Sequence, residues 1–351
     1  SQRVRHVADY FRQQFAQVTN PPIDPLREAI VMSLETAFGP EMNIFEETSE
    51  HARRVIVSSP VLSHSKFAQL KQIDLPGYGF EVIDLNYAES EGLQAAIQRI
   101  CAQAEAAVRA GRSQLILSDR DIRAGFLPIS ALMATGAVHH HLMNAGWRCD
   151  ANLIVETGFA RDPHHFAVLI GFGASAVYPY LAYDIIADMA RNGEILGDPL
   201  EAQGYFRKGI DKGLLKIMSK MGISTIASYR GAQLFEAVGL DSKVVETCFK
   251  GVPSRIQGAN FADIEGDQRL LADDAWKARK SLDQGGLLKF VYGKEYHAFN
   301  PDVINSLHTA VRSGDYTDYL AYADLVNQRP VATIRDLLQL KRAAQALPIN
   351  D

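Results

Sequence analysis

Short apolar runs alternate with longer amphipathic segments between about residues 54 and 240. Six of these runs, rich in β-branched and other apolar residues, predict strands at residues 54–58, 80–85, 114–118, 152–156, 175–178 and 224–227. The segments with helical spacing, several of them ended by glycine, predict helices at residues 90–110, 129–145, 163–171, 179–191, 202–220 and 232–238. Continuous apolar strands that alternate with helices are typical of a parallel sheet covered by helices. The predicted fold class is therefore α/β, as a (β/α)₈ barrel, whole or incomplete, or as an open doubly wound sheet.

The two ends of the chain follow other patterns. Apolar positions at helical spacing predict a first helix at residues 6–18, and a proline-rich break separates it from a second predicted helix at residues 25–36. After about Asn260 acidic residues become dense, and residues 285–340 predict short helices with exposed Tyr316, Tyr319 and Tyr322. We expect one domain over residues 1–272 and a mostly helical segment over residues 273–351.

Charge and cysteine spacing narrow the function classes. The net charge is −5 with acids and bases interspersed, so no basic stripe indicates a nucleic-acid partner. The longest apolar stretches are far shorter than the roughly 20 residues that span a bilayer, and the first residues lack the pattern of a secretion signal. The three cysteines match no zinc or iron–sulfur spacing. These features predict a cytoplasmic protein with no nucleic-acid and no membrane partner.

Polar side chains mark the ends of the predicted strands and the loops that follow them. In either α/β fold the carboxyl ends of the strands form the edge where a site lies. The candidate residues at this rim are Ser58, Ser59, Pro60, Ser118, Asp119, Arg120, Glu156, Arg161, His164 and His165. The carboxylates among them could act as general bases, but neighbouring charges of opposite sign favour mutual ion pairing that fixes the loops.

Histidines suggest a second kind of chemistry. His139, His140 and His141 lie in one predicted helix, and His164 and His165 begin the next. Three consecutive helical residues point about 100° apart and cannot converge on one ion, so at most one of them could join one of the pair, with Glu156 as a further ligand. A metal hydrolase built on these residues is the less favoured hypothesis, and hydrogen bonding to neighbouring groups is the favoured one.

Two glycine-containing segments could meet a phosphate. The segment 171–174 (GFGA) lacks the full dinucleotide-binding spacing and is better interpreted as a helix end. The segment 221–225 (MGIST) could bind a flavin phosphate if it lies at the late strands of a barrel. This observation keeps open a flavin- or phosphate-binding (β/α) barrel enzyme in its own right.

Several of these segments resemble blocks of the large subunit of glutamate synthase, in the same order along the chain. They are residues 15–28 (FAQVTNPPIDPLRE), 135–142 (TGAVHHHL), 228–237 (SYRGAQLFEA), 254–258 (SRIQG), 293–297 (GKEYH) and 335–338 (RDLL). The family more often has Gly-Glu-Ala-Arg-Glu at positions 158–162, where this chain has Phe159 and Asp162, and more often has Lys at position 230, where this chain has Arg230. These departures weaken any specific role for those side chains.

The resemblance implies a central connecting domain, similar to a rudimentary TIM barrel without its flavin, followed by the start of the FMN-binding synthase domain. It implies that the parent enzyme turns glutamine and 2-oxoglutarate into two glutamates, with FMN and an iron–sulfur cluster held outside this chain. The implied partners are the glutaminase and FMN domains of the same polypeptide, with a small subunit or ferredoxin as electron donor. The rim residues are then expected to form a docking or ammonia-tunnel surface, with no catalytic, cofactor or metal site in this chain.

Overall fold

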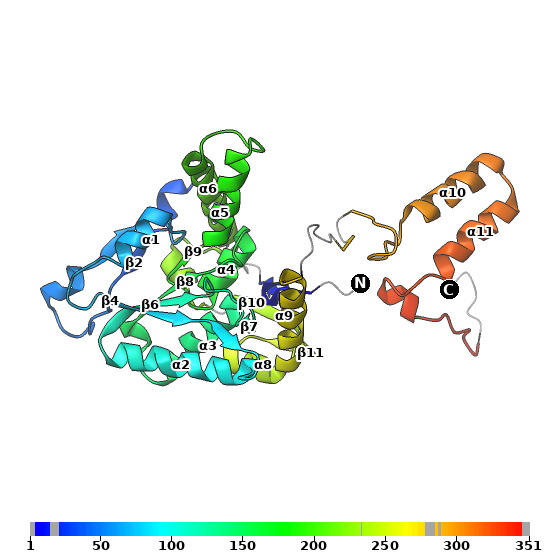
Figure 1. Ribbon diagram of the computed structural model, residues 1–351. Coiled ribbons are helices and arrows are strands. Elements are labelled where there is room, and N and C mark those ends of the chain that lie inside the picture. Colours follow the sequence, from blue (N-terminus) through cyan, green and yellow to red (C-terminus); the bar gives the residue numbers. More distant parts are fainter. Residues whose placement is uncertain (1–3, 15–20, 233, 278–284, 287–288, 346–351) are drawn as a thin grey trace. The chain divides into compact units, whose positions relative to one another are not determined.

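The computed structural model describes residues 4–14, 21–232, 234–277, 285–286 and 289–345 (Figure 1). The chain divides into two compact units, residues 4–277 and residues 278–351 together with residues 1–3, and each unit is described by itself. The predicted boundary between residues 272 and 273 stays a prediction.

A parallel sheet of four strands is the centre of the first unit. In spatial order its strands are β4 (Gly79–Asp84), β6 (Arg112–Ser118), β8 (Asn152–Glu156) and β9 (Ala176–Tyr178). Successive strands are connected through the helices α2 (Leu93–Arg109), α3 (Ala131–Asn144) and α4 (Pro163–Gly171). These elements confirm the predicted α/β class. Over the described residues the sheet is open, so the structure is not a closed barrel.

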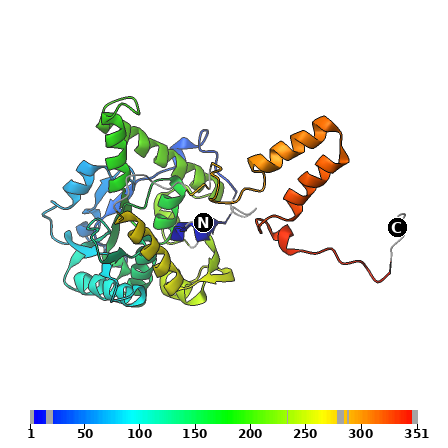
Figure 2. The same cartoon turned by 45° about the vertical axis from the view of Figure 1, so that its right-hand side comes forward.

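The two faces of the sheet pack into two separate cores because successive side chains of a strand point to opposite faces. Leu115, Leu117 and Val155 join the core that contains α2, α3 and α4. Ile116 and Ile154 join the other core, which contains α1 (His64–Leu70) and the beginning of α5 (Tyr180–Arg191). Figures 1 and 2 show α2 and α3 on one side of the sheet and α1 on the other. Burial of both faces accounts for the continuous apolar runs 115–117 of β6 and 153–155 of β8, whereas residues 80–82 of β4 are exposed.

Smaller sheets surround the parallel one. Antiparallel pairs are formed by β2 (Thr36–Phe38) with β3 (Val55–Val57), and by β5 (Asn86–Ala88) with β7 (Phe126–Pro128). A third sheet joins β1 (Phe11–Gln13), β10 (Phe235–Leu240) and β11 (Ser254–Ala259). The strand predicted at residues 54–58 therefore exists but lies outside the parallel sheet.

The predicted helix at residues 6–18 is wrong over its described part. The chain forms a short 3-10 helix, Val7–Tyr10, and then enters β1. Phe11 is fully buried and its ring packs at 4.9 Å from that of Phe172 and 4.7 Å from that of Phe249. Pairing with β10 and this aromatic cluster override the helical spacing, and the end of the predicted helix lies outside the described residues.

Three further predictions need correction. Residues 25–36 contain a turn and a short 3-10 helix, Ala29–Val31, in place of a long helix. Residues 224–227 enter the short helix α7 (Ile226–Tyr229) where a strand was expected. Residues 235–238, expected to be helical, begin strand β10, because the Phe235 and Ala237 side chains alternate into the core.

The remaining helices of this unit are α6 (Pro199–Met221), α8 (Ser242–Cys248) and α9 (Phe261–Ala275), and 3-10 turns lie at Ser49–Ala52 and Arg148–Asp150. Helix α3 approaches α8 at Gly136, where a Cβ atom would lie 2.0 Å from the carbonyl oxygen of Cys248. Helix α6 approaches α4 at Gly213, where a Cβ atom would lie 2.4 Å from the Pro163 ring. Glycine at these positions permits the close helix packing.

The second unit is mostly helical where it is described, as predicted. Its helices α10 (Pro301–Ser313) and α11 (Tyr316–Asn327) pack together, followed by the 3-10 helix Ile334–Leu337. Gly314 ends α10 with a φ of +67°, and Asp315 caps α11. Within the described parts of both units, no helix has the length and apolar character to cross a membrane.

Candidate functional site at the ends of the parallel strands

Strands β6, β8 and β9 end side by side, in register, at Ser118, Glu156 and Tyr178. Parallel pairing places the carboxyl ends of these strands at one edge of the sheet. The structure therefore brings together four of the residues predicted from the sequence, namely Ser118, Asp119, Arg120 and Glu156.

Asp119 is an enclosed carboxyl group at this edge, with 8% of its surface exposed, the same fraction as for Glu156. One carboxylate oxygen accepts a hydrogen bond from the Thr157 hydroxyl and the other accepts one from the Gly158 N–H at 3.0 Å. Burial raises the pKa of the Asp119 carboxyl, and the hydrogen bonds to Thr157, Gly158 and Tyr180 oppose this rise. Because its partners all come from the chain itself, Asp119 ties the loop after β6 to the loop after β8.

Glu156 is held in a similar way. It accepts a hydrogen bond of 2.7 Å from the Ser118 hydroxyl and forms an ion pair of 3.4 Å with the Arg120 guanidinium. The Arg120 guanidinium also stacks 4.7 Å from the centre of the Tyr180 ring. The sequence favoured ion pairing over a role as general base for these carboxylates, and Glu156 is indeed paired with Arg120.

Arg161, His164 and His165 bind the N-terminal segment. The Arg161 guanidinium donates to His6 Nε2 at 3.1 Å, and His164 Nε2 donates to the Ala8 carbonyl at 2.9 Å. The buried His165 accepts from the Arg161 N–H at 3.4 Å through Nδ1, and burial lowers the pKa of His165 to about 4. Arg161 and His164 therefore hold the segment that precedes β1, and the His165 ring lies beside that of His6, with 6.3 Å between the ring centres.

Ser58, Ser59 and Pro60 follow β3 and approach the sheet beside β9. The Ser59 hydroxyl donates to Asp211 of α6 at 2.6 Å, and the Pro60 carbonyl accepts from the Val177 N–H at 2.8 Å beside β9. The exposed Ser58 lies 3.5 Å from the Lys66 ammonium. Val61, next to Pro60, forms an isolated parallel bridge with Val177 of β9. Over the described residues no hydrogen bond or ion pair joins Ser58, Ser59 or Pro60 to Asp119 or Glu156.

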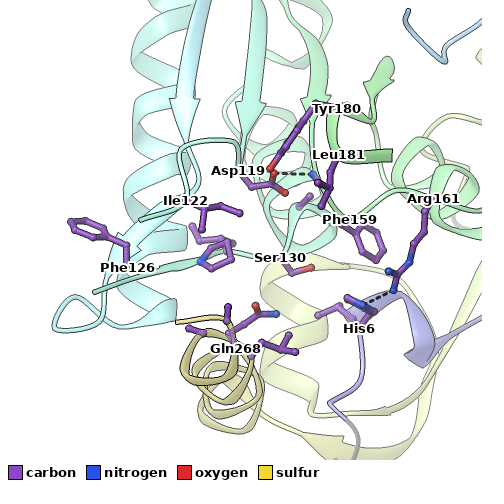
Figure 3. Close-up of a pocket in the computed structure, with 18 of the residues that line it drawn as sticks. His6, Asp119, Ile122, Phe126, Ser130, Phe159, Arg161, Tyr180, Leu181 and Gln268 are labelled. Atoms are coloured by element: carbon purple, nitrogen blue, oxygen red, sulfur yellow. Dashed lines mark hydrogen bonds between the residues drawn. The ribbon is translucent and has the colours of Figure 1, made fainter. Parts of the chain in front are cut away.

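A cavity of about 350 Å³ opens beside the strand ends (Figure 3). We call it the strand-end cavity. It is lined by His6, Val7, Asp119, Ile122, Phe126, Pro128, Ile129, Ser130, Ala131, Gly158, Phe159, Arg161, Tyr180, Leu181, Gln268, Leu271, Ala272, Ala275 and Trp276. Most of this lining is apolar, and Figure 3 shows Asp119 and Arg161 on different sides of it.

Most of the cavity walls escaped the sequence reasoning. His6 and Val7 come from the segment misread as a long helix. Gln268 and Leu271 come from α9, for which no helix was predicted, and Trp276 follows directly at its C-cap. A signal for α9 was present, because Asn260 followed by Asp263 forms a capping box at its start.

The histidine triplet does not converge. His139 Nδ1 accepts from Arg148 at 2.9 Å, and His141 Nε2 lies 2.7 Å from Glu105. Burial lowers the pKa values of both His139 and His140. Across the described residues, no group of three or more His, Cys, Asp or Glu side chains is arranged to hold a metal ion. The geometry thus gives the metal-hydrolase hypothesis no support.

The glycine segments have structural roles in the described chain. Gly222 ends α6 with a φ of +68°, and the N–H groups of Gly222, Ile223 and Ile226 donate to backbone carbonyls. These donors are therefore not available to a flavin phosphate. Gly171 is the last residue of α4, where a Cβ atom would lie 2.5 Å from the Phe235 ring, and Gly173 follows with a φ of +120°.

Some of the groups that could bind FMN or an iron–sulfur cluster are already bonded or buried in the described chain. In the segment 221–225 the N–H groups of Gly222 and Ile223 are bonded to backbone carbonyls. Cys101 and Cys248 are buried thiols whose pKa values burial raises, whereas Cys149 is exposed. Thiolates are the ligands of such clusters, so these groups are poorly suited to one.

Comparison with known proteins decides the family. A family model described as "Glutamate synthase central domain" matches residues 1–241. This chain belongs to the glutamate synthase central domain family. The whole chain is 40% identical to 17% of the glutamate synthase [NADH] of Schizosaccharomyces pombe, and 40% identical to 23% of the ferredoxin-dependent glutamate synthase 1 of Arabidopsis thaliana. It is 39% identical to 23% of the glutamate synthase [NADPH] large chain of Bacillus subtilis. The central-domain chain thus spans about a fifth of the length of these relatives.

The similarity of this chain to solved structures is weaker than its similarity to the glutamate synthase sequences. A crystal structure of mandelate oxidase with benzoyl-formic acid matches 37% of this chain and 35% of its own, at 15% identity and a TM-score of 0.30. A variant of flavocytochrome b2 with benzoylformate matches 64% of this chain and 46% of its own, at 14% identity and a TM-score of 0.33. Neither similarity bears on the function of this central domain.

Proposed function

We propose that this chain is the connecting region of a glutamate synthase, and that its strand-end edge is a docking or ammonia-tunnel surface with no catalytic role of its own. The parent reaction would turn glutamine and 2-oxoglutarate into two glutamates. The observation that carries the proposal is that the strand-end carboxylates Asp119 and Glu156 are already bound by donors of this chain. A general base must instead reach a proton of the substrate.

The chemistry of the strand-end cavity suits passage of a small neutral molecule. Its walls are mostly apolar, from Ile122, Phe126, Leu181 and Leu271 among others. Exclusion of water in such a site protects a reactive species from side reactions. Ammonia that travels between two active sites needs walls of this kind, since protonation to ammonium would end its use as a nucleophile.

The proposal includes partners and cofactors outside this chain. The glutaminase and FMN domains would lie on the same polypeptide, FMN and an iron–sulfur cluster would be bound there, and a small subunit or ferredoxin would supply electrons. The names of the relatives support this range of donors, because they specify NADH, NADPH and ferredoxin. The cytoplasmic location remains part of this proposal.

A pair of leucine variants in the full-length enzyme tests the tunnel role. Leu181 lines the strand-end cavity, whereas Leu196 is 95% exposed and lies outside its lining. We expect Leu181→Arg to place a charge in the passage, so that glutamine is still hydrolysed while free ammonia accumulates and less glutamate forms. Leu196→Arg should leave the ratio of glutamate formed to glutamine hydrolysed unchanged. A Leu181→Arg enzyme that releases no ammonia and keeps the parental ratio would contradict the tunnel role.

The alternative of an independent flavin- or phosphate-binding barrel makes a different prediction. It requires this chain to bind FMN stoichiometrically, with quenching of the flavin fluorescence. We expect no saturable quenching at micromolar chain, because the N–H groups of Gly222, Ile223 and Ile226 are already bonded. One FMN bound per chain would refute our proposal and establish the alternative.

A further inference from the structure

The strand-end cavity exposes several large apolar side chains at one concave place. Ile122, Leu181, Leu271 and Trp276 line it and keep 55%, 41%, 40% and 54% of their surfaces exposed. Its volume of about 350 Å³ lies within the range of small-molecule sites, which are mostly apolar with a few polar groups that fix orientation. Apolar surface gathered in this way indicates a ligand or partner that covers it.

Arg161 supplies a positive charge at the wall of the cavity. Its guanidinium donates to His6 Nε2, and a nitrogen that accepts this bond belongs to a neutral ring. Within the described part of the chain, no carboxylate lies within 4.0 Å of Arg161. The charge of Arg161 is thus uncompensated and can bind an anionic group of a ligand.

Asp119 does not oppose an anion at Arg161. Its carboxylate is enclosed by the Thr157 hydroxyl and the Gly158 N–H, and it lies on another side of the cavity (Figure 3). Ser130 and Ala131, where α3 begins, also line the cavity, and Ser130 makes no side-chain capping bond there. The partial positive charge of that helix start adds to the field of Arg161.

We infer that the strand-end cavity binds a small amphipathic anion, with an aromatic or branched apolar body among Ile122, Leu181 and Trp276 and a single negative group on Arg161. This inference goes beyond the tunnel role, since it assigns a ligand site to the same cavity. A ligand bound there would be placed to influence ammonia passage.

A pair of matched dyes tests the inference. 8-Anilinonaphthalene-1-sulfonate and N-phenyl-1-naphthylamine share their aromatic body, and the first carries a sulfonate that the second lacks. Trp276 in the cavity wall is the reporter, through quenching of its fluorescence on dye binding. The chain has one other tryptophan, Trp147, and the variant Trp276→Phe separates the two signals.

Two variants and two controls locate the dye. Arg161→Ala should weaken sulfonate-dye binding by about threefold to tenfold, as expected for one charge-assisted contact at a partly exposed site, with no change for the neutral dye. Ala275→Phe should fill the cavity and weaken both dyes at least tenfold. The controls are Arg191→Ala, which removes an exposed arginine of α5, and Ala262→Phe, which enlarges an exposed residue of α9 outside the lining.

The outcomes decide the inference. Saturable binding of one sulfonate dye per chain, weakened by Arg161→Ala and by Ala275→Phe but by neither control, supports it. An affinity for the sulfonate dye that is unchanged by Ala275→Phe, or unchanged by Arg161→Ala, overturns the inference. A stoichiometry that falls as self-association rises in sedimentation equilibrium also overturns it, because a second copy then covers the cavity. The ammonia measurement on the Leu181→Arg enzyme is separate, so the two proposals can fail independently.

Discussion

Gly136 offers the sharpest test of how the helices of this domain pack. A Cβ atom at this position would lie 2.0 Å from the carbonyl oxygen of Cys248 and 3.3 Å from the Phe249 ring. Ordinary contact begins at 3.4 Å, so Gly136→Ala requires α3 and α8 to separate by roughly 1.4 Å in an interior packed as densely as an organic crystal. The obstacle is a backbone atom, which cannot move aside by a change of side-chain rotamer.

The sign of the effect follows from two opposing contributions. Replacing glycine with alanine inside a helix stabilises it by about 1 kcal/mol through propensity. Overpacking a rigid core costs about 1–3 kcal/mol and at times more, and a backbone clash of this depth places the cost at the upper end. We therefore expect a net loss of about 1–3 kcal/mol in the free energy of unfolding.

Gly209→Ala is the matched control. Gly209 lies within α6, and a Cβ atom there would meet nothing within 4 Å. The same chemical change should then stabilise the protein by about 0.5–1 kcal/mol. Two identical substitutions in two helices are thus expected to have opposite signs.

Urea unfolding followed by tryptophan fluorescence measures both variants, because Trp147 and Trp276 both belong to the unit of residues 4–277. With a denaturant slope of about 3 kcal/mol per molar, the upper end of the usual range and suited to a unit of this size, the midpoint of Gly136→Ala should fall by about 0.3–1 M. A Gly136→Ala protein as stable as the parent would show that α3 and α8 do not approach as described, and our account of this contact would be wrong.

Two further predictions concern buried ionisable groups. Burial, with the charge of Arg148 adding to it, lowers the pKa of His139 from 6.5 to about 3. The unfolded chain therefore binds the proton more readily than the folded one. The stability that is present above pH 6.5 is lost as the pH falls toward 3, by at most about 1.4 kcal/mol per pH unit. His139→Asn keeps an acceptor for Arg148 and should reduce the loss of stability between pH 7 and pH 5 in urea titrations, whereas a pH dependence identical to that of the surface control His308→Asn would exclude His139 as its source. Asp119→Ala leaves the Thr157 hydroxyl and the Gly158 N–H without their acceptor and should lower the free energy of unfolding by about 2–3 kcal/mol. Asp121→Ala, at an exposed residue, should change it by less than about 0.5 kcal/mol. Equal effects of the two variants would contradict the role given to Asp119.

The strands of the parallel sheet were predictable because their surroundings are uniform. β6 and β8 are buried on both faces, so their apolar residues form continuous runs between polar loops. β10 has no such signature. Phe235 and Ala237 face the core while Val238 is 37% exposed, and the decision for a strand comes from pairing with β1, more than 200 residues earlier in the chain. Spacing along one segment cannot carry information about a partner so distant in sequence.

The candidate site divides in the same way. Ser118, Asp119 and Glu156 follow directly from strand ends that meet at one edge, so a correct strand assignment was sufficient to bring them together. Ser59 follows a run that forms an antiparallel pair outside this sheet, and its hydroxyl is bonded to Asp211 of α6, so its place at the rim stays a prediction. His6 lines the cavity but was not predicted there, because the helical spacing of its segment suggested a long helix and the chain forms only the short 3-10 helix Val7–Tyr10.

The rim of strand ends explains why residue types alone overstate catalytic chemistry in this chain. A carboxylate next to an arginine at a strand end is a common feature of enzymes, and here Glu156 and Arg120 have that arrangement. Each partner already has a second contact, Glu156 with the Ser118 hydroxyl and Arg120 with the Tyr180 ring. A group whose lone pairs and charge are satisfied at rest must break those contacts to act on a substrate, which raises the barrier by their combined strength. These contacts hold the loops around the apolar cavity rigid, and a passage or ligand site requires that rigidity.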